Sequence, residues 1–124
     1  MHNNYIAGEW VGSKEAVKNH NPSDISDLIG HYAQATTAQL EAAIDAATAA
    51  HKIWQATGLE ARQTALMKIG NALIDQADEL GELLSREEGK PRAEGRGEVY
   101  RAGQFFTYYA AEVLRQIGDN ADSV

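Results

Sequence analysis

The fold of this chain is decided by residues 59–91, LEARQTALMKIGNALIDQADELGELLSREEGKP, in which apolar side chains recur at helical spacing. One side of this stretch carries residues spaced mostly three or four apart: Leu66, Ile69, Leu73, Ala77, Leu80, Leu83 and Leu84. The other side is polar and charged. An apolar stripe of this length has to be buried against another part of the protein.

A single helix over the whole stretch is too long for a compact domain of this size, because roughly thirty residues would span about 45 Å. We therefore predict a break at Asp78, whose carboxylate can accept a hydrogen bond from the free N–H groups of a second helix. Glu79 and Glu82 would lie in its first turn, where the helix dipole favours acidic side chains. Gly89 suits a left-handed helix-ending conformation, and Pro91 forbids continuation.

The length, composition and net charge of the chain indicate one modest, acidic domain. The chain has 124 residues, of which 44% are hydrophobic and 23% charged, as in ordinary globular proteins. Its formal charge of −7 argues against nucleic acid and anionic membranes as partners. The absence of cysteine excludes a disulfide, a thiolate nucleophile and a Cys-ligated metal within this sequence. With no apolar run long enough to cross a bilayer and no leader-like start, we expect a cytoplasmic protein.

Residues 1–35 are expected to form short strands and turns. Residues 5–11, YIAGEWV, predict two strands around a turn in which Gly8 supplies a positive φ. Residues 16–20 and 28–35 predict two more extended segments, separated by a turn at Asn21-Pro22. Together these segments predict a small N-terminal antiparallel β-sheet.

Residues 36–118 are expected to be helical, with helices over about 37–55, 59–77, 78–89 and 94–117. Thr36 and Gln39 have the spacing of a capping box at the start of the first helix. Gly118 is expected to close the last one. The predicted fold class is therefore mainly α with a small N-terminal antiparallel β-sheet, in one incomplete domain with a polar tail over 119–124.

Two packing expectations follow from these helices. Trp54 is predicted to pack on the Leu66, Ile69 and Leu73 side of the next helix, because the connection between the two helices is short. The last helix carries its own apolar stripe at spacings of three and four: Val99, Ala102, Phe106, Tyr109, Ala110, Val113, Leu114 and Ile117.

Most residue clusters that could carry chemistry have a simpler explanation. The four histidines, His2, His20, His31 and His51, lack the short spacing of metal ligands on one element. Turn formation explains the polar cluster Ser13, His20, Ser23, Asp24, Ser26 and Asp27. Adjacent residues on a helix point about 100° apart, so Glu87 and Glu88 cannot share a substrate atom. We therefore predict no catalytic and no metal-binding residue in this chain.

The glycine-rich and basic residues near the start of the last helix are also weak candidates for a phosphate-binding or anion-binding site. Gly95-Arg96-Gly97 lacks the third glycine, the preceding strand and the Lys-Ser/Thr of true phosphate loops, so no cofactor-binding residue is predicted. The last helix and the residues before it also carry a run of basic side chains: Arg86, Lys90, Arg92, Arg96 and Arg101. Glutamates are interleaved with them, so the local charge nearly cancels and the run is a weak candidate for an anion site.

Four aromatic residues cluster on two turns of the last helix. Phe106 and Tyr109 fit its core stripe, so core packing explains them. Phe105 and Tyr108 do not fit this stripe and should face another surface. For these two residues, a wall of a substrate site is the alternative to core packing.

The order of landmarks along the chain resembles the N-terminal part of the aldehyde dehydrogenase superfamily. The resemblance covers essentially the whole chain and is carried by residues 5–11, Asn21-Pro22, Ile29-Gly30, the alanine-rich helix ending in Trp54, residues 79–91 with the ending Glu-Glu-Gly-Lys-Pro, and residues 98–110. The Gly-Glu-Trp hairpin and the Glu-x-Gly-Lys-Pro ending are its most specific parts.

Members of that family are several times longer and oxidise aldehydes to carboxylates with NAD or NADP. The resemblance implies that the nucleophilic cysteine, the general-base glutamate and the cofactor-binding glycines lie downstream of Val124. It also implies that the last helix borders the substrate entrance, with Phe105 and Tyr108 as wall residues. For residues 1–124 alone we expect neither catalysis nor cofactor binding.

Two interpretations of different classes follow. The chain is the N-terminal fragment of an NAD(P)-dependent aldehyde dehydrogenase, acting on an aldehyde such as a semialdehyde, or it is a free-standing helical interaction module. The reading frame after Val124 distinguishes them. Apolar helix faces left uncovered predict a homo-oligomer, with contacts through Phe105, Tyr108, Val113 and Leu114.

Overall fold

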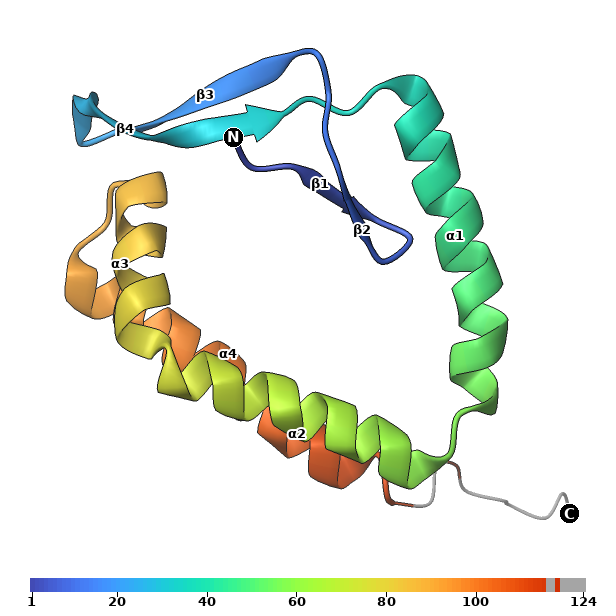
Figure 1. Cartoon of the computed structure of the whole chain (residues 1–124). Coiled ribbons are helices and arrows are strands. Elements are labelled where there is room, and N and C mark those ends of the chain that lie inside the picture. The colour runs from blue at the N-terminus through green and yellow to red at the C-terminus, as the bar shows by residue number, and fades with distance from the viewer. Residues whose placement is uncertain (116–117, 119–124) are drawn as a thin grey trace, which may run out of the picture.

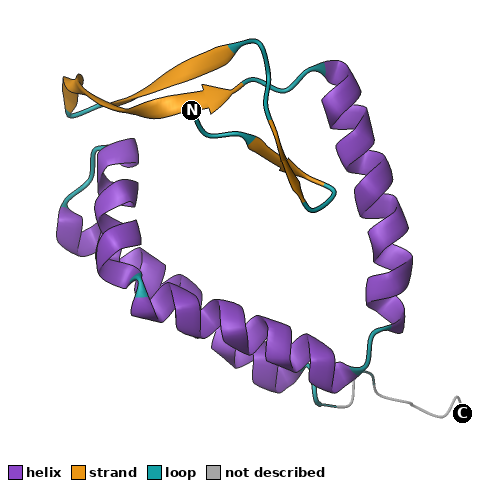
Figure 2. Cartoon of the chain, viewed as in Figure 1, coloured by secondary structure: helices purple, strands orange, loops and turns teal. Residues whose placement is uncertain are grey.

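A computed structural model describes residues 1–115 and 118 of the chain and divides them into two hairpins and four helices (Figure 1). The elements, in order, are β1 (Asn4–Ile6), β2 (Glu9–Val11), β3 (Ala16–Asn21), β4 (Asp24–Ala33), α1 (Thr37–Ala56), α2 (Leu59–Asp75), α3 (Ala77–Glu88) and α4 (Arg92–Glu112). The mainly helical class is confirmed, but the strands form two separate two-stranded antiparallel sheets instead of one (Figure 2). The polar tail predicted over 119–124 lies outside the described residues.

The first hairpin has the predicted turn. Strands β1 and β2 pair Tyr5 with Trp10, and their rings lie 5.0 Å apart. Ala7 and Gly8 both have positive φ, 53° and 88°, which is the conformation that lets a two-residue turn match the twist of its strands.

The second hairpin is longer than the sequence predicts. Strand β4 begins at Asp24 instead of at Leu28, because the backbone N–H of Ser23 donates to Oδ1 of Asn21 and closes a tight turn there. The first half of β4 is exposed and polar. Its residues therefore lack the alternation that marks a half-buried strand.

Helix α1 begins at the predicted capping box but lies apart from the other helices (Figure 1). The N–H of Thr36 donates to Oε1 of Gln39 at 2.9 Å, and the N–H of Gln39 donates to Oγ1 of Thr36 at 3.2 Å. None of the residues of α1 is buried.

The predicted packing of Trp54 on helix α2 is wrong. Thr57 and Gly58 are both extended, so the chain leaves α1 in a new direction and the two helices diverge. Trp54 is 47% exposed, and the Arg62 guanidinium lies 5.8 Å from its ring centroid. Nη2 of Arg62 also donates to the carbonyl oxygens of Trp54 and Gln55 at the end of α1.

The break in the 59–91 stretch occurs two residues earlier than predicted. Gln76 ends α2 and precedes α3 without a side-chain cap, and Asp78 instead pairs with Arg96 of α4. Gly89 ends α3 with φ 71°, as predicted. The carbonyl oxygen of Ser85, in the last turn of α3, accepts hydrogen bonds from the backbone N–H groups of both Gly89 and Lys90.

Helix α4 differs from its predicted range at both ends. It begins at Arg92, directly after Pro91, and ends at Glu112 instead of at 117. Beyond that point, the N–H groups of Leu114 and Arg115 donate to the carbonyl oxygens three residues earlier. This spacing is that of a 3₁₀ turn and not of an α-helix. Gly118 has a positive φ but does not close this helix.

The core is a contact of small residues, in which α4 runs back antiparallel along α2 and α3 (Figure 1). The buried residues on the α2 and α3 side are Gly70, Ala77, Gly81 and Ser85, and those on α4 are Gly95, Val99, Gly103 and Ala110. The aliphatic stripe lies beside this contact, with Ile69 44% and Leu83 37% exposed. Tyr109, expected in the core stripe of α4, is 59% exposed.

The helices approach so closely that a Cβ atom does not fit at several of these positions. A Cβ atom at position 81 would lie 2.5 Å from Cα of Arg96, and one at position 103 would lie 2.8 Å from the carbonyl oxygen of Gly70. Glycine is therefore required there by a close approach of two backbones.

Much apolar surface remains uncovered. The chain exposes 9435 Å², whereas a compact monomer of 13.5 kDa exposes about 6,500 Å². Exposed large apolar side chains include Leu40, Ile44 and Ile53 of α1 and Phe105 of α4. Across the residues that the structure describes, no helix has the length and apolar character needed to cross a membrane.

Gly81→Ala should destabilise the chain by about 1–3 kcal/mol, because the added methyl group forces α3 away from α4. Urea unfolding followed by circular dichroism measures the change. The matched control is Gly97→Ala on α4, where nothing lies within 4 Å of the new Cβ. This variant should gain about 0.5–1 kcal/mol from helix propensity. Equal effects of the two substitutions would contradict the close contact.

Candidate functional site

An exposed aromatic groove runs along the outer face of α4. Arg101, Phe105 and Tyr108 are spaced four and three residues apart, which places them on one helix face, and Gln104 and Tyr109 complete the lining. The groove has a volume of about 320 Å³. Phe105 and Tyr108 are 58% and 59% exposed, so both predicted wall residues face away from the helix contact. Tyr109 stands edge-on to Tyr108, with centroids 5.2 Å apart.

Arg101 is the basic residue of this groove, and it differs from the rest of the basic run. The other four residues pair with carboxylates: Arg86 with Asp27, Lys90 with Glu88 and Glu98, Arg92 with Glu82, and Arg96 with Asp78. Within the described part of the chain, no carboxylate oxygen lies within 4.0 Å of the Arg101 guanidinium. The predicted cancellation of charge therefore holds for four of the five residues.

A second cluster joins the β3–β4 hairpin to the end of α3. Arg86 donates from Nε and Nη2 to the two carboxylate oxygens of Asp27, at 2.9 and 2.6 Å. Asn21 donates to the same carboxylate, and Oγ of Ser23 donates to the carbonyl oxygen of Gly89 at 2.9 Å. We call these five residues the hairpin clamp. Paired donors from one guanidinium fix both distance and orientation, so the clamp sets where the hairpin sits.

The clamp changes the acidity of Asp27. Its hydrogen bonds from the Arg86 guanidinium lower the pKa of this carboxyl from 3.8 to about 2, against the opposing effect of partial burial. The same pairing raises the pKa of Arg86. Both shifts favour the charged pair over the physiological range.

Glu87 and Glu88, adjacent on α3, contact different partners. Oε1 of Glu87 accepts from Nδ2 of Asn19 at 3.0 Å and from the hydroxyl of Tyr32 at 3.1 Å. Burial and this bond to Glu87 raise the pKa of Tyr32. Glu88 instead pairs with Lys90 at 2.5 Å. Glu87 thus extends the link between the hairpin and α3.

Two of the histidines and one serine of the polar cluster make contacts that support the fold. His2 stacks on Tyr32 with ring centroids 4.7 Å apart, and Nδ1 of His20 lies 3.0 Å from the carbonyl oxygen of Ile25. Ser26 bonds to Asp24 within the hairpin. Residues 1–115 and 118 contain no group of three or more His, Cys, Asp or Glu side chains that could hold a metal ion.

Gly95-Arg96-Gly97 lies inside α4 and does not form a loop. Gly95 is buried against Ser85 and Gly81, and its N–H is bonded to the carbonyl oxygen of Pro91. Backbone groups already used within a helix cannot cradle a phosphate. Gly95-Arg96-Gly97 therefore does not form a phosphate-binding loop.

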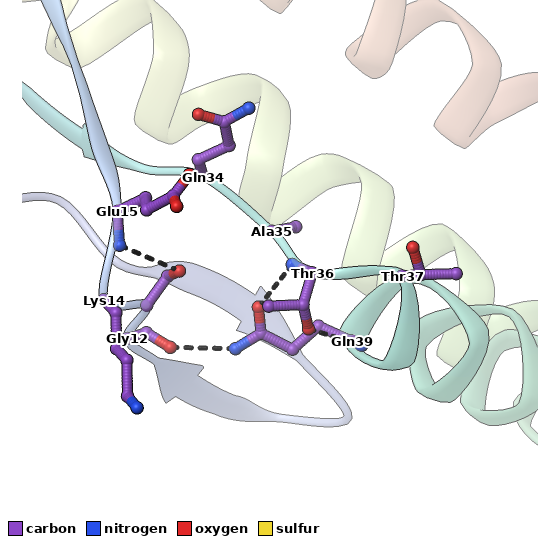
Figure 3. Close-up of a pocket in the computed structure, with 9 residues that line it drawn as sticks. Gly12, Lys14, Glu15, Gln34, Ala35, Thr36, Thr37 and Gln39 are labelled. Carbon is purple, nitrogen blue, oxygen red and sulfur yellow. Dashed lines mark hydrogen bonds between the residues drawn. The ribbon is translucent and has the colours of Figure 1, made fainter.

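A wider groove of about 700 Å³ lies where the β2–β3 connection meets the start of α1 (Figure 3). Its lining is mostly polar, and the side chain of Gln39 spans it by donating to the carbonyl oxygen of Gly12 at 2.8 Å. This bond ties the first hairpin to α1. The groove thus holds elements together and presents no cluster of titratable groups suited to catalysis.

Comparison with known proteins settles the family. Residues 10–123 match the aldehyde dehydrogenase family. The chain belongs to this family. This aldehyde dehydrogenase sequence is 39% identical over 111 residues to an alpha-ketoglutarate semialdehyde dehydrogenase of Haloferax volcanii. The aligned residues cover 88% of this chain and 23% of the relative. It is 35% identical over 116 residues to the NADP(+) succinate-semialdehyde dehydrogenase of Escherichia coli, covering 92% and 24%.

Solved aldehyde dehydrogenase structures share the fold of this segment. A mutant 1-pyrroline-5-carboxylate dehydrogenase of Thermus thermophilus superimposes with a TM-score of 0.89 at 36% identity, covering 99% of this chain and 24% of that chain. A betaine aldehyde dehydrogenase of Staphylococcus aureus, solved with NAD+, gives 0.90 at 26% identity, covering 99% and 25%. The chain spans about a quarter of the length of the curated relatives it matches.

Three residues of the aromatic groove and the pairing of the clamp were not predicted as site features. Arg101 could have been found from its spacing to Phe105 and Tyr108, since residues four and seven apart share a helix face. The Asp27–Arg86 pair has no such signal, because its partners lie 59 residues apart and meet only in the folded chain.

Asp27→Asn should flatten the dependence of stability on pH between about pH 4 and pH 2. Because the folded pKa of Asp27 lies below its ordinary value, its stabilisation is complete above pH 4 and is lost as the pH falls toward 2. Thermal melts across this range measure the effect. Asp45→Asn on α1 removes a carboxylate outside the clamp, so its curve should run parallel to that of the unmodified chain. A parallel curve for Asp27→Asn would show that the clamp does not stabilise the fold.

Proposed function

We propose that this chain is the N-terminal segment of an NAD(P)-dependent aldehyde dehydrogenase that oxidises a carboxylate-bearing semialdehyde. The observation that carries the proposal is the family match over residues 10–123, together with relatives named for alpha-ketoglutarate, glutarate and succinate semialdehydes. In this proposal the catalytic thiol and the cofactor site belong to the rest of the enzyme, since the chain contains no cysteine.

The uncovered surface supports a role as part of a larger protein. Helix α1 buries none of its residues, and its apolar face carries Leu40, Ile44 and Ile53. Burial of such a face contributes about 25 cal/mol per Å², so a partner surface is strongly favoured. The remaining three quarters of a family member would supply that surface.

Within this enzyme, Phe105 and Tyr108 would form a wall of the substrate entrance. Their rings project from α4 into a groove that no other described element covers. Large rigid side chains at such a position select the shape of a ligand at little cost in conformational entropy. The assembled enzyme would be a cytoplasmic homo-oligomer, because the net charge of −7 and the exposed apolar faces suit a soluble assembly of several copies.

A chimera tests the proposed function. Residues 1–115 of this chain replace the matching segment of the E. coli succinate-semialdehyde dehydrogenase, and NADP+ reduction is followed at a substrate-saturating concentration. We expect a soluble enzyme with kcat within about tenfold of the parent, because the segment positions the fold and supplies none of the catalytic groups.

Two controls make the result decisive. The E. coli enzyme with its matching segment deleted should be inactive or insoluble, since apolar surface would be left bare. A chimera carrying Gly81→Ala should lose thermal stability, as expected from the helix contact. A chimera that is soluble and folded but has no activity would contradict the proposal.

A further inference from the structure

We propose that Arg62 is the positioning residue that fixes the direction of α1 relative to α2. Helix α1 buries none of its residues, so packed side chains do not hold it against the next helix. A single guanidinium of α2 lies at the end of α1, where it contacts both the backbone and the ring of Trp54. This role concerns the conformation of the chain and does not depend on the proposed function.

The Arg62 guanidinium bridges the two helices through two hydrogen bonds and a ring contact. Nη2 donates to the carbonyl oxygen of Trp54 at 2.9 Å and to that of Gln55 at 2.6 Å. The guanidinium carbon lies 5.8 Å from the centroid of the Trp54 ring, within the range of a cation–π contact. Nε is buried and has no hydrogen-bond partner in the part of the chain that the structure describes. The side chain is therefore partly enclosed at the junction of the helices.

The charge of Arg62 suits the end of α1 better than it suits its own helix. Arg62 is the fourth residue of α2, near the positive end of that helix dipole, where a cation is disfavoured. The carbonyl groups at the end of α1 carry the opposite partial charge, and the last turn of α1 has no basic residue of its own. Among the described residues, no carboxylate oxygen lies within 4.0 Å of Arg62. The end of α1 is therefore what stabilises this charge.

The connection between the helices does not fix their angle by itself. Thr57 and Gly58 are extended, with φ of −69° and −60°. A Cβ atom at position 58 would meet nothing within 4 Å, so neither the torsion nor the space requires glycine there. Glycine at such a position adds backbone freedom, which the contacts of Arg62 restrict. At the other end of α1, Gln39 donates to the carbonyl oxygen of Gly12, so polar contacts hold this helix near both ends (Figure 1).

Fixing the direction of α1 also orients its apolar face. Leu40, Ile44 and Ile53 are exposed along this helix. A surface that covers these side chains meets them already in place, which lowers the conformational entropy lost on contact.

The experiment measures the distance between α1 and α2 by double electron–electron resonance on the 124-residue chain. The chain contains no cysteine, so Glu41→Cys and Asn71→Cys, at exposed positions of the two helices, give a single pair of spin labels. Dilution with unlabelled chain removes distances between copies. With Arg62 present we expect one narrow distance distribution. Arg62→Gln removes the charge and the bridging donors, so the distribution should about double in width as further directions of α1 become populated.

Three variants distinguish a lost contact from a loosened fold. Lys68→Gln removes a cation from an exposed position further along α2 and should leave the distribution unchanged. Gly58→Pro suits the observed φ of −60° and the extended Thr57, and it should narrow the broadened distribution of Arg62→Gln because proline fixes that torsion. Arg62→Lys keeps the charge without the planar fork of donors, so it should broaden the distribution less than Arg62→Gln does. It replaces Arg62→Gln if circular dichroism shows that the glutamine variant loses helix.

Every outcome decides the role of Arg62. A folded Arg62→Gln chain whose distribution stays as narrow as that of the unmodified chain would overturn the proposal. So would a broad distribution in the unmodified chain, equal broadening by Lys68→Gln, or broadening that Gly58→Pro does not reduce. Broadening that is confined to the Arg62 variants and reduced by Gly58→Pro would establish that Arg62 sets the direction of α1.

Discussion

Helix α4 can lie against α2 and α3 only because glycine stands at the points where the backbones meet. A Cβ atom at position 70 would lie 2.7 Å from Cγ2 of Thr107, and one at position 81 would meet the backbone of Arg96. With the helices this close, Val99 and Ala110 are sufficient to fill the remaining space. Dispersion between backbones then replaces the interlocking of large side chains.

This close contact determines where the exposed apolar surfaces lie. Because small residues occupy the contact face of α4, its large residues are displaced to the opposite side, where Phe105 and Tyr108 form the groove. The aliphatic residues of α2 are likewise left partly exposed, as Ile69 shows. The segment thus presents apolar surface in two directions, on the outer face of α4 and along α2.

The sequence predicted what depends on neighbouring residues and missed what depends on distant ones. The capping box of Thr36, the left-handed Gly89 and the turn at Gly8 are local features, and each is confirmed. The break at Gln76 and the direction of α1 were mispredicted because backbone torsions at the connections decide them. For the groove, the exposure of Phe105 and Tyr108 followed from helical spacing. The pairing of neighbouring arginines, which singles out Arg101, required the fold.

The hairpin clamp has a consequence for how the chain is made. Asp27 and Arg86, which the clamp joins directly, are 59 residues apart in the sequence. At about 5–20 residues per second, a ribosome delivers the helix partner roughly 3–12 s after the strand. Through that interval the β3–β4 hairpin is a two-stranded sheet with open edges and an exposed Ile25. Isolated hairpins are marginally stable, and open edges invite pairing with other chains. The polar residues of β4 that obscured it in the sequence, Asp24, Ser26 and Asp27, are of the kind that disfavours such pairing at an open edge.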